Sequence, residues 1–506
     1  MFGTLLSLTA LAAPIAQAPT HEDVMSSLLT PVTSFDGPGL DADSQVISQR
    51  RLVLLDTDLL LPVKEGGAQQ IKIDLFGGET VTAKLMERIP ARDGYVWRGQ
   101  VVGEDKDSDV LLSVVGESMT ASIRSQGRLF RISAAEDGPV HYLAELDENA
   151  FPGCATTAAE EVFGVDAHDH FHGGGRNPII DVMVVYTKKA RNAQGGTNAM
   201  DSLINLAVTE TNGGYNNSDV TQRLALVHTY EIANYTENGN FSTELGRLRA
   251  KNDGHFDEIH PMRDQYGADA VAMIVASSQY CGIAYLMTNP SHSFESSAFS
   301  VTARTCATGY YSFGHELGHN FGSNHDRQNA SSGAYNYSFG WRTSNNQYRT
   351  IMAYSPGSRI KYFSNHNKSK NGMPLGSQGS AENWRSLNNT ATYTSNWRDS
   401  AVGYELTMTV GVLQSGSTAT ATISGSDQGD VIYLYNGSGN GSTTIPGLGI
   451  DLEIANASVV AQKTAGAGGF VIISKNLPAR FAGMTVYLQA ADADGRMSAV
   501  HSDTIL

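Results

Sequence analysis

The sequence predicts a multidomain protein with a central α/β domain between two domains built mainly of strands. Its 506 residues exceed what one hydrophobic core normally holds, so two to four domains are expected. Strand-like and helical stretches alternate between residues 178 and 397, which favours a sheet with crossover helices. On either side, short apolar runs are separated by Gly, Ser and Asp turns with almost no helical period.

The first 18 residues are predicted to be a signal peptide. The apolar run of residues 5–18 ends in an A-x-A cleavage pattern. Two features are atypical of an export signal: no Lys or Arg precedes Arg50, and Pro19 would be the first mature residue. A buried start or a misplaced start codon is therefore the alternative. No later stretch is long enough to span a membrane, and we expect a secreted protein.

Residues 19–154 are predicted to form a β-rich domain, and residues 155–177 a linker. The linker segment has no apolar period and contains three consecutive glycines. Three histidines in it, at alternate positions, are a possible metal site, but a solvated linker is the favoured interpretation; they are His168, His170 and His172. The strand-like runs of the first domain are residues 51–56, 69–76, 109–115 and 128–133.

The central domain, residues 178–397, contains both strand-like and helical patterns of apolar residues. A helix is predicted from residue 197 and is expected to end at Gly213 and Gly214. Residues 401–506 lack a helical period and are predicted to form a C-terminal β-sandwich. Other expected strands are 179–187, 223–232, 269–277, 281–286 and 298–304, and other expected helices are 242–253, 255–266 and 310–321.

The charge balance narrows the range of partners. The formal net charge of −16 argues against nucleic acid and against an anionic membrane surface. It favours solubility and carries no further information about function. No convincing calcium-loop motif is present, so calcium stays possible but unsupported.

A metal-binding pattern lies in the helix expected at residues 310–321. His315 and His319 are four residues apart and so share one face of that helix. Gly322 can adopt the left-handed conformation that ends a helix, which would bring His325 to the same ion. Three imidazole ligands leave a fourth position for water, the arrangement of a catalytic zinc site.

Glu316 lies beside the first ligand and is the predicted general base. Zinc lowers the pKa of a bound water towards about 7 and polarises a carbonyl group. Glu316 can then take the proton of that water and pass it to the leaving amine. An ordinary amphipathic helix is the alternative for a bare H-E-x-x-H. The extended H-E-x-x-H-x-x-G-x-x-H pattern favours the zinc interpretation.

With this motif the chain resembles the metzincin metallopeptidases. That resemblance implies a Met-turn beneath the metal, for which Met352 in "TIMAYSPG" is the candidate. Asp326, directly after the third histidine, resembles the adamalysin branch. Tyr354, two residues after Met352, resembles the tyrosine of astacins and serralysins, which is a fifth zinc ligand or a donor to the oxyanion. A buried core tyrosine is an equal alternative.

Within the metzincins, residues 178–397 are most similar to the bacterial peptidyl-Asp metalloendopeptidases of the Asp-N type. "ETNGGYNNSDVTQRLALV", "CGIAYL" and "TIMAYSPGSRIKYFSN" carry this resemblance. It implies that a peptide substrate pairs with the strand containing Gly282 and Ala284, although another core strand is the alternative. It also implies a pocket near Arg359 and Lys361 that would favour Asp or Glu, unless these are solvated surface cations.

The three cysteines suggest one disulfide and one free thiol. Cys281 and Cys306 flank the expected active-site strand and helix and are the favoured pair. Cys154 then remains free. By resemblance to metzincin propeptides, it would be a temporary zinc ligand that keeps a zymogen silent, with an incidental buried thiol as the alternative. Residues 19–154 would be the propeptide and residues 155–177 the activation linker, with Asp166 and Asp169 as candidate self-cleavage points.

The sequence therefore predicts a secreted zinc endopeptidase made as a latent zymogen. One rival is a metzincin of broad or different specificity. The other is a binding or adhesion protein whose protease domain is vestigial, because C-terminal β-sandwich modules often bind a surface or a substrate.

Overall fold

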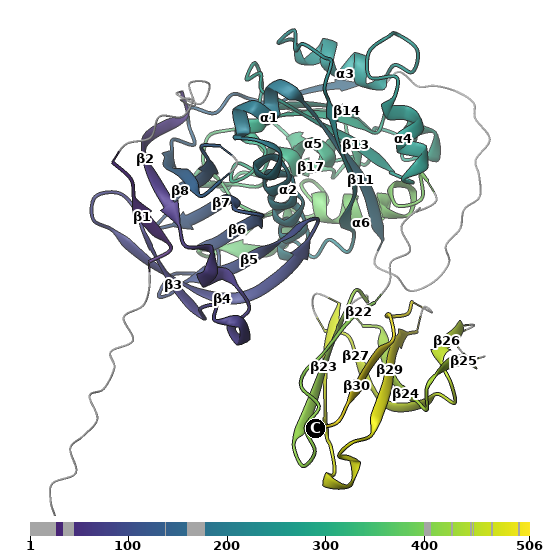
Figure 1. Ribbon diagram of the computed structural model, residues 1–506. Helices are drawn as coiled ribbons and strands as arrows, with labels where there is room; N and C mark the ends of the chain where they lie inside the picture. The colour runs from purple at the N-terminus through teal and green to yellow at the C-terminus, as the bar shows by residue number, and fades with distance from the viewer. Residues whose placement is uncertain are drawn as a thin grey trace, which may run out of the picture.

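The computed structural model describes five stretches of the chain (Figure 1). They are residues 27–33, 45–136, 138–158, 178–398, and 406–506 apart from 427–428, 446–447, 449, 467–468 and 494–495. The predicted signal peptide lies outside the described residues. So does most of the predicted linker, including Asp166, Asp169 and the three linker histidines.

The N-terminal part forms one antiparallel sheet in which the strand order is β1-β2-β9-β8-β7-β6-β5-β4-β3. From β3 to β9 each strand lies next to its successor in the chain, so short turns suffice to connect them, and β2 pairs with β9. The nine strands are β1 (Leu29–Pro31), β2 (Ile47–Leu55), β3 (Gln70–Asp74), β4 (Thr80–Ala91), β5 (Gly94–Val101), β6 (Asp109–Val115), β7 (Ser118–Ser125), β8 (Arg128–Ala134) and β9 (Val140–Leu146).

The two ends of this sheet meet. Ser27, just before β1, bridges to Lys72 of β3, and the amide of Leu28 donates to the carbonyl of Lys72 at 2.8 Å. The sheet therefore curls until its edges touch, which removes exposed edges that could pair with another chain. Its interior holds a hydrophobic core that includes the fully buried Trp97 and Phe130.

The central part has a six-stranded mixed sheet with the order β10-β14-β15-β13-β11-β12. β14 runs antiparallel to β15, and the remaining pairs are parallel. An α/β arrangement with crossover helices is thus present, as the alternating pattern predicted. The strands are β10 (Ala155–Ala158), β11 (Ile179–Thr187), β12 (Arg223–Ile232), β13 (Ala270–Val275), β14 (Gly282–Leu286) and β15 (Phe299–Ala303).

The elements around this sheet are short except for one long helix, α2. The helices are α1 (Lys188–Gln194), α2 (Thr197–Asn217), α3 (Phe241–Arg249), α4 (Ile259–Gln265), α5 (Ser312–Asn320) and α6 (Asn383–Thr394). Small strands follow α5: β16 (Asn324–Asp326), β17 (Phe339–Gly340), β18 (Tyr348–Arg349), β19 (Ser358–Arg359), β20 (Asn365–Lys370) and β21 (Met373–Leu375).

The prediction that α2 ends at Gly213 and Gly214 is wrong. The helix continues through both glycines to Asn217. A Cβ on Gly214 would lie 2.9 Å from Cδ1 of Ile351, so a neighbouring segment packs directly against the helix backbone there. A glycine inside a helix costs up to about 1 kcal/mol, and here it allows this close approach.

The predicted linker begins later than residue 155. Ala155–Ala158 form β10, which pairs in parallel with β14, so that Ala155 lies opposite Ile283 and Ala158 opposite Leu286. The amide of Cys281 also donates to the carbonyl of Gly153 at 2.9 Å. The chain leaving the N-terminal sheet therefore covers the strand that would otherwise be the edge of the central sheet.

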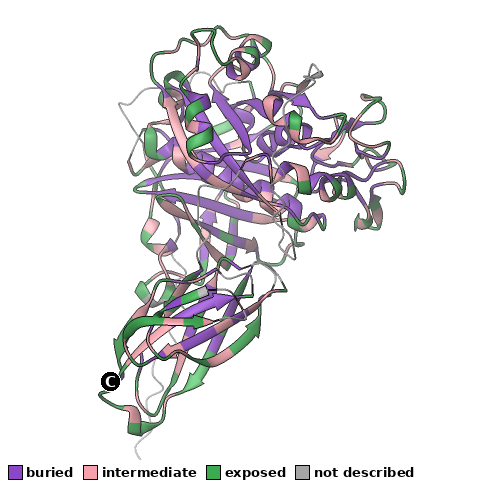
Figure 2. Cartoon of the chain, turned by 90° about the vertical axis from the view of Figure 1, so that its right-hand side faces the viewer, coloured by how far each residue is buried: buried purple, intermediate pink, exposed green. Residues whose placement is uncertain are grey.

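The N-terminal sheet packs against α2 of the central part (Figure 1). Leu206 of α2 shares a small buried cluster with Val96 and Leu111. Arg124 of β7 is buried, and its Nε donates to the hydroxyl of Tyr311 at 2.7 Å. Apolar and polar contacts thus join the two parts, and buried residues run continuously through both (Figure 2).

Among its described residues, the C-terminal part has strands and one 3-10 turn at Ala479–Phe481. A three-stranded sheet (β22-β23-β28) and a four-stranded sheet (β27-β24-β29-β30) contribute side chains to one core. The strands are β22 (Thr407–Val410), β23 (Thr418–Ser424), β24 (Val431–Gly437), β25 (Asn440–Ile445), β26 (Ile450–Ile454), β27 (Ser458–Thr464), β28 (Phe470–Asn476), β29 (Thr485–Asp492) and β30 (His501–Thr504).

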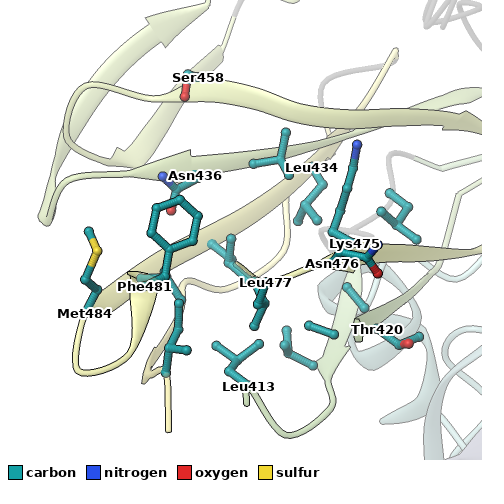
Figure 3. A pocket seen from close by; sticks show the side chains of 18 residues that line it. Leu413, Thr420, Leu434, Asn436, Ser458, Lys475, Asn476, Leu477, Phe481 and Met484 are labelled. Carbon is teal, nitrogen blue, oxygen red and sulfur yellow. The ribbon is translucent and has the colours of Figure 1, made fainter. Parts of the chain in front are cut away.

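A cavity of about 490 Å³ lies between these two sheets (Figure 3). Its walls are mainly aliphatic side chains from both sheets, with Phe481 and Met484 at one end and Lys475 at the other. Its volume falls within the range of about 300–1,000 Å³ that is typical of small-molecule sites. Among the described residues of the whole chain, no helix is long and apolar enough to cross a membrane.

Candidate metal and catalytic site

The helix α5 is fixed rigidly against the central sheet. Every one of its residues, Ser312–Asn320, is buried. The side-chain amide of Asn320 donates to the carbonyls of Tyr285 in β14 and Phe299 in β15, at 2.9 and 3.1 Å. Because both neighbouring strands hold its C-terminal end, side chains on the opposite face of the helix have fixed positions.

Gly322 ends this helix and turns the chain. Its φ of +91° is in the left-handed region, and the amide of Ser323 donates to the carbonyl of Gly318 at 2.8 Å. A Cβ at position 322 would lie 2.5 Å from the Cβ of Ala334, so only glycine fits. The turn leads directly into β16, which carries His325 back to α5.

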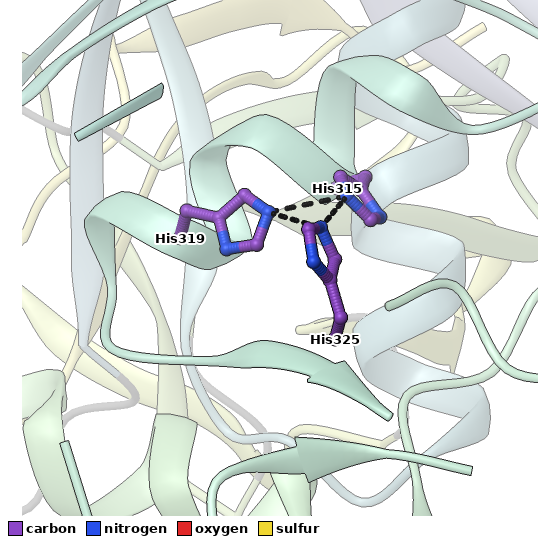
Figure 4. Close-up of side chains that lie close together, drawn as sticks. All are labelled: His315, His319 and His325. Carbon is purple, nitrogen blue, oxygen red and sulfur yellow. Dashed lines mark hydrogen bonds between the residues drawn. The ribbon is translucent and has the colours of Figure 1, made fainter. Parts of the chain in front are cut away.

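The imidazoles of His315, His319 and His325 converge on one point (Figure 4). Their Nε2 atoms are 3.1–3.2 Å apart. Tetrahedral zinc with bonds of about 2.1 Å would separate its ligands by roughly 3.4 Å, so the three nitrogens fit one zinc ion. Nδ1 of His315 lies 2.8 Å from the Ile351 carbonyl, and Nδ1 of His319 lies 2.9 Å from the Ser323 carbonyl. These contacts orient the rings and leave Nε2 free to bind metal.

Burial keeps all three imidazoles neutral. It lowers the pKa of His315 and of His325 well below the ordinary value, and it lowers the pKa of His319 to about 3. The positive charge of Arg359 acts in the same direction. Because only a neutral imidazole has a lone pair for a metal, this environment favours coordination.

Glu316 points into the same buried space. Burial raises its pKa well above the ordinary value and outweighs the thiol of Cys154, which lies beside the carboxylate, and the charge of Arg359, both of which lower that pKa. Gly282 of β14 lies so close that a Cβ there would be 2.4 Å from Cγ of Glu316. A buried carboxylate with so little hydrogen bonding is costly in a purely structural role, and such groups are concentrated at active sites.

Met352 and Tyr354 both lie against the segment that carries the histidines. Sδ of Met352 approaches to 2.7 Å of the position that a Cβ on Gly318 would take, so the thioether packs under α5. The ring of Tyr354 lies 3.9 Å from that of His325, measured between centroids. The backbone amide of Tyr354 donates to Asp326 at 3.0 Å, which ties the third histidine to this segment.

Cys154 enters the site from the N-terminal part. Its Sγ lies within 4.8 Å of a ring nitrogen of His315 and of a carboxylate oxygen of Glu316. Its backbone carbonyl accepts a hydrogen bond from the hydroxyl of Tyr354. Burial, followed by the nearby charge of Glu316, raises the pKa of the thiol. The other two cysteines, Cys281 and Cys306, form a disulfide.

The two cations considered for the substrate pocket have different surroundings. Arg359 is buried rather than solvated; its Nη1 donates to the Tyr310 carbonyl at 3.0 Å, and its Nε has no partner among the described residues. Its charge lowers the pKa of Glu316 and of the three imidazoles. Lys361 points instead to the N-terminal sheet, where it pairs with Asp109.

Two features of this site are absent from the sequence-based expectations. One is the strand β10, whose small polar sequence gives no strand signal. The other is Phe151, whose ring stacks on that of Tyr310 with centroids 4.1 Å apart. Neither has a local sequence signature, because both depend on contacts between segments more than 100 residues apart.

Comparison with known proteins agrees with this geometry. Residues 176–364 match the model of metallo-peptidase family M12, in its Reprolysin_5 form. The peptidyl-Asp metalloendopeptidase of Stenotrophomonas maltophilia (strain K279a) is 36% identical over 347 residues, which cover 63% of this chain and 81% of that protein. The chain belongs to the peptidyl-Asp metalloendopeptidase family.

A second family member, from Xanthomonas campestris pv. campestris, is 34% identical over 414 residues, or 77% of this chain and 91% of that protein. Membership makes this chain a zinc metalloendopeptidase of the metzincin type. A solved chaperone–substrate complex covers 44% of this chain and 36% of its own at 20% identity and a TM-score of 0.35, too weak a similarity to transfer a fold.

Proposed function

We propose that this peptidyl-Asp metalloendopeptidase family member is a secreted zymogen in which Glu316 is the general base. The observation that carries the proposal is the convergence of three Nε2 atoms beside the buried carboxylate of Glu316. Zinc, when bound by the three histidines, supplies a Lewis acid for the scissile carbonyl and for water. Glu316 takes the proton from the attacking water and delivers it to the leaving nitrogen.

Tyr354 is proposed to assist once the N-terminal part has left. Its hydroxyl donates to the carbonyl of Cys154 in the full-length chain. Without that acceptor, the same donor is available to the substrate oxygen on which negative charge develops. Donors aimed at such an oxygen are typically worth about 10²- to 10³-fold in rate.

The proposed specificity is cleavage before Asp or Glu. Arg359 would bind the acidic side chain that follows the cleaved bond. Its support is a buried guanidinium whose Nε has no partner in the described part of the chain and whose charge acts on Glu316 and the histidines. An acidic side chain would supply the missing acceptor through a charge-assisted hydrogen bond. The names of the relatives, which refer to peptidyl-Asp cleavage, point to the same substrate class.

Latency is proposed to have two components. Cys154 would occupy the fourth coordination position, and β10 covers the edge strand β14 to which a substrate would otherwise pair. β10 runs parallel to β14. A substrate that pairs antiparallel with β14 would run in the direction opposite to β10. The peptide bonds of β10 are therefore reversed relative to those of such a substrate. Release would follow cleavage in the linker, for which Asp166 and Asp169 remain the candidates.

Export and the role of the C-terminal part complete the proposal. The disulfide between Cys281 and Cys306 supports an oxidising compartment. The apolar cavity between the C-terminal sheets supports an accessory binding role for residues 401–506. Deleting them would then lower cleavage of a protein substrate and leave that of a short peptide unchanged.

The test of the central proposal is Glu316→Ala. The variant should bind one zinc per chain, measured by elemental analysis, and should lose peptide hydrolysis by about 10²-fold or more. Retained activity would exclude Glu316 as the base. An inactive wild-type protein with zinc bound, after removal of the N-terminal part, would favour the vestigial, adhesive alternative.

A further inference from the structure

An acidic loop of the N-terminal sheet lies on a lysine-bearing surface of the catalytic domain. The acidic loop, residues 102–109, consists of the connection from β5 to β6 and the first residue of β6. Nζ of Lys370 lies 2.5 Å from Oδ2 of Asp107 and 3.3 Å from Oδ2 of Asp105. Nζ of Lys361 pairs with Asp109. Three carboxylates within five residues thus neutralise two lysines of another domain.

The surrounding contacts show a built interface. The hydroxyl of Tyr362, next to Lys361, donates to the other oxygen of Asp107 at 3.0 Å. The side chains of Lys361 and Lys370 are only 13% and 11% exposed. We call Lys361, Tyr362 and Lys370 the lysine face. Among the described residues, every ion-pair partner of these two lysines belongs to the acidic loop.

Removal of the N-terminal part would take away the three carboxylates that pair with the lysine face; Glu210 of α2, whose pKa the charge of Lys361 lowers, would remain near Lys361. The two ammonium groups would then be exposed and ready to pair with carboxylates of similar spacing. Lys361 lies two residues after Arg359, at most about 7 Å along the backbone. A peptide held at Arg359 would therefore reach the lysine face within a few residues of the cleaved bond.

We propose that the lysine face is an exosite for an acidic stretch of the protein substrate, which the acidic loop covers in the full-length chain. The proposal rests on the proposed removal of the N-terminal domain. The loop itself is the observed example of the ligand: a short peptide that contains three Asp residues. The site selects among protein substrates by charge near the cleaved bond, in addition to the residue read by Arg359.

The test uses the mature enzyme and two peptides with one shared cleavage site between a fluorophore and a quencher. Beyond the quencher, one peptide carries Asp-Lys-Asp-Ser-Asp and the other Asn-Lys-Asn-Ser-Asn, each with N-methylated peptide bonds before its Asp or Asn residues so that the tail itself is not cleaved. We expect KM to be about tenfold lower for the acidic peptide at low salt. The difference should shrink as salt screens the charges. The double variant Lys361→Gln, Lys370→Gln should lose the preference.

Lys368→Gln is the matched control. Lys368 lies in β20 between the two others but pairs with Asp219 of its own domain at 2.6 Å. This variant should keep the preference. Equal KM values for the two peptides in the wild-type enzyme, or a preference that survives the double variant, would overturn the exosite.

A second measurement avoids variants that fold poorly. The peptide of residues 102–110, added to wild-type mature enzyme, should slow cleavage of the acidic-tailed peptide more than that of the Asn-tailed one. If the added peptide slowed the cleavage of the two substrates equally, it would bind at the active site alone, and the proposal would be contradicted. N-terminal sequencing and gel filtration report whether the N-terminal domain has left. If active enzyme keeps it, the activation proposal fails as well; if it leaves and no preference exists, the exosite alone fails.

Discussion

Gly282 and Glu316 share a space that only one side chain can occupy. A Cβ on Gly282 would lie 2.4 Å from both Cγ and Oε1 of Glu316, well inside van der Waals contact. The two residues come from different elements, β14 and α5, which pack face to face. The strand β14 therefore limits the space around the Glu316 carboxylate, in addition to being the candidate surface for substrate pairing.

The first prediction follows from that contact. Gly282→Ala should displace the carboxylate of Glu316 and reduce kcat/KM for a short peptide by about 10²- to 10⁴-fold, the usual contribution of a general base. Zinc content should be unchanged, because the three histidines are not touched. Gly246→Ala is the control: no atom lies within 4 Å of its added Cβ, so activity should stay at the wild-type level. An active Gly282→Ala enzyme would show that Glu316 does not need its present position.

The second prediction concerns latency. Full-length Cys154→Ala should cleave a short peptide about ten times faster than full-length wild type. This factor corresponds to about 1.4 kcal/mol of lost inhibition by the thiol. The increase is limited because β10 still covers β14. Rates are measured before any cleavage of the chain is visible on a gel. Equal rates for the two proteins would assign Cys154 a purely structural role.

The third prediction concerns the substrate pocket. Arg359→Leu should reduce the preference for Asp over Asn after the cleaved bond by about 10- to 100-fold, the worth of a charge-assisted hydrogen bond. Arg359→Lys should recover part of it, because a lysine keeps the charge but loses the planar fork. The measurement is sequence profiling of the products of a denatured protein mixture. Arg327→Ala, at an exposed arginine, should leave the profile unaltered; an unaltered profile in Arg359→Leu would exclude the pocket.

The fourth prediction concerns acid and the N-terminal sheet. His141 is fully buried, and its Nε2 accepts a hydrogen bond from the amide of Met119 at 2.8 Å. Burial lowers its pKa to about 4, against about 6.5 in the unfolded chain. Between these values the unfolded state binds a proton that the folded state does not. Stability therefore falls as pH drops from 6.5 to 4, by about 3 kcal/mol in all.

The measurement for His141 is a comparison of two inactive proteins. Unfolding free energies are determined at pH 7 and pH 5 in the Glu316→Ala background, with and without His141→Gln. The comparison is needed because buried Glu210, whose pKa burial raises to about 7, acts with the opposite sign: its contribution is lost as pH rises from 4.5 to 7. The His141→Gln protein should lose less stability on acidification. Identical pH dependence would contradict the role of His141.

Much of the catalytic site was open to prediction because its pattern is local. A helix fixes the relation of His315 to His319, and Gly322 marks the turn towards His325, so spacing alone indicates a common metal. The steric relation of Gly282 to Glu316 was not predictable, since nothing in the sequence sets how closely β14 approaches α5. Gly213 and Gly214 show the opposite error: a glycine pair read as a helix end serves close packing inside a helix.

By itself, the sequence determined the class of chemistry: a catalytic zinc pattern with its base in one short segment, set in an α/β domain between two β-rich parts. The tertiary structure decided which distant groups meet there. It brought Cys154 and β10 to the site, buried Arg359 beside it, and assigned Lys361 to the acidic loop. The reason is physical: helical spacing is set by local backbone geometry. Contacts between residues hundreds of positions apart are set only when the domains pack.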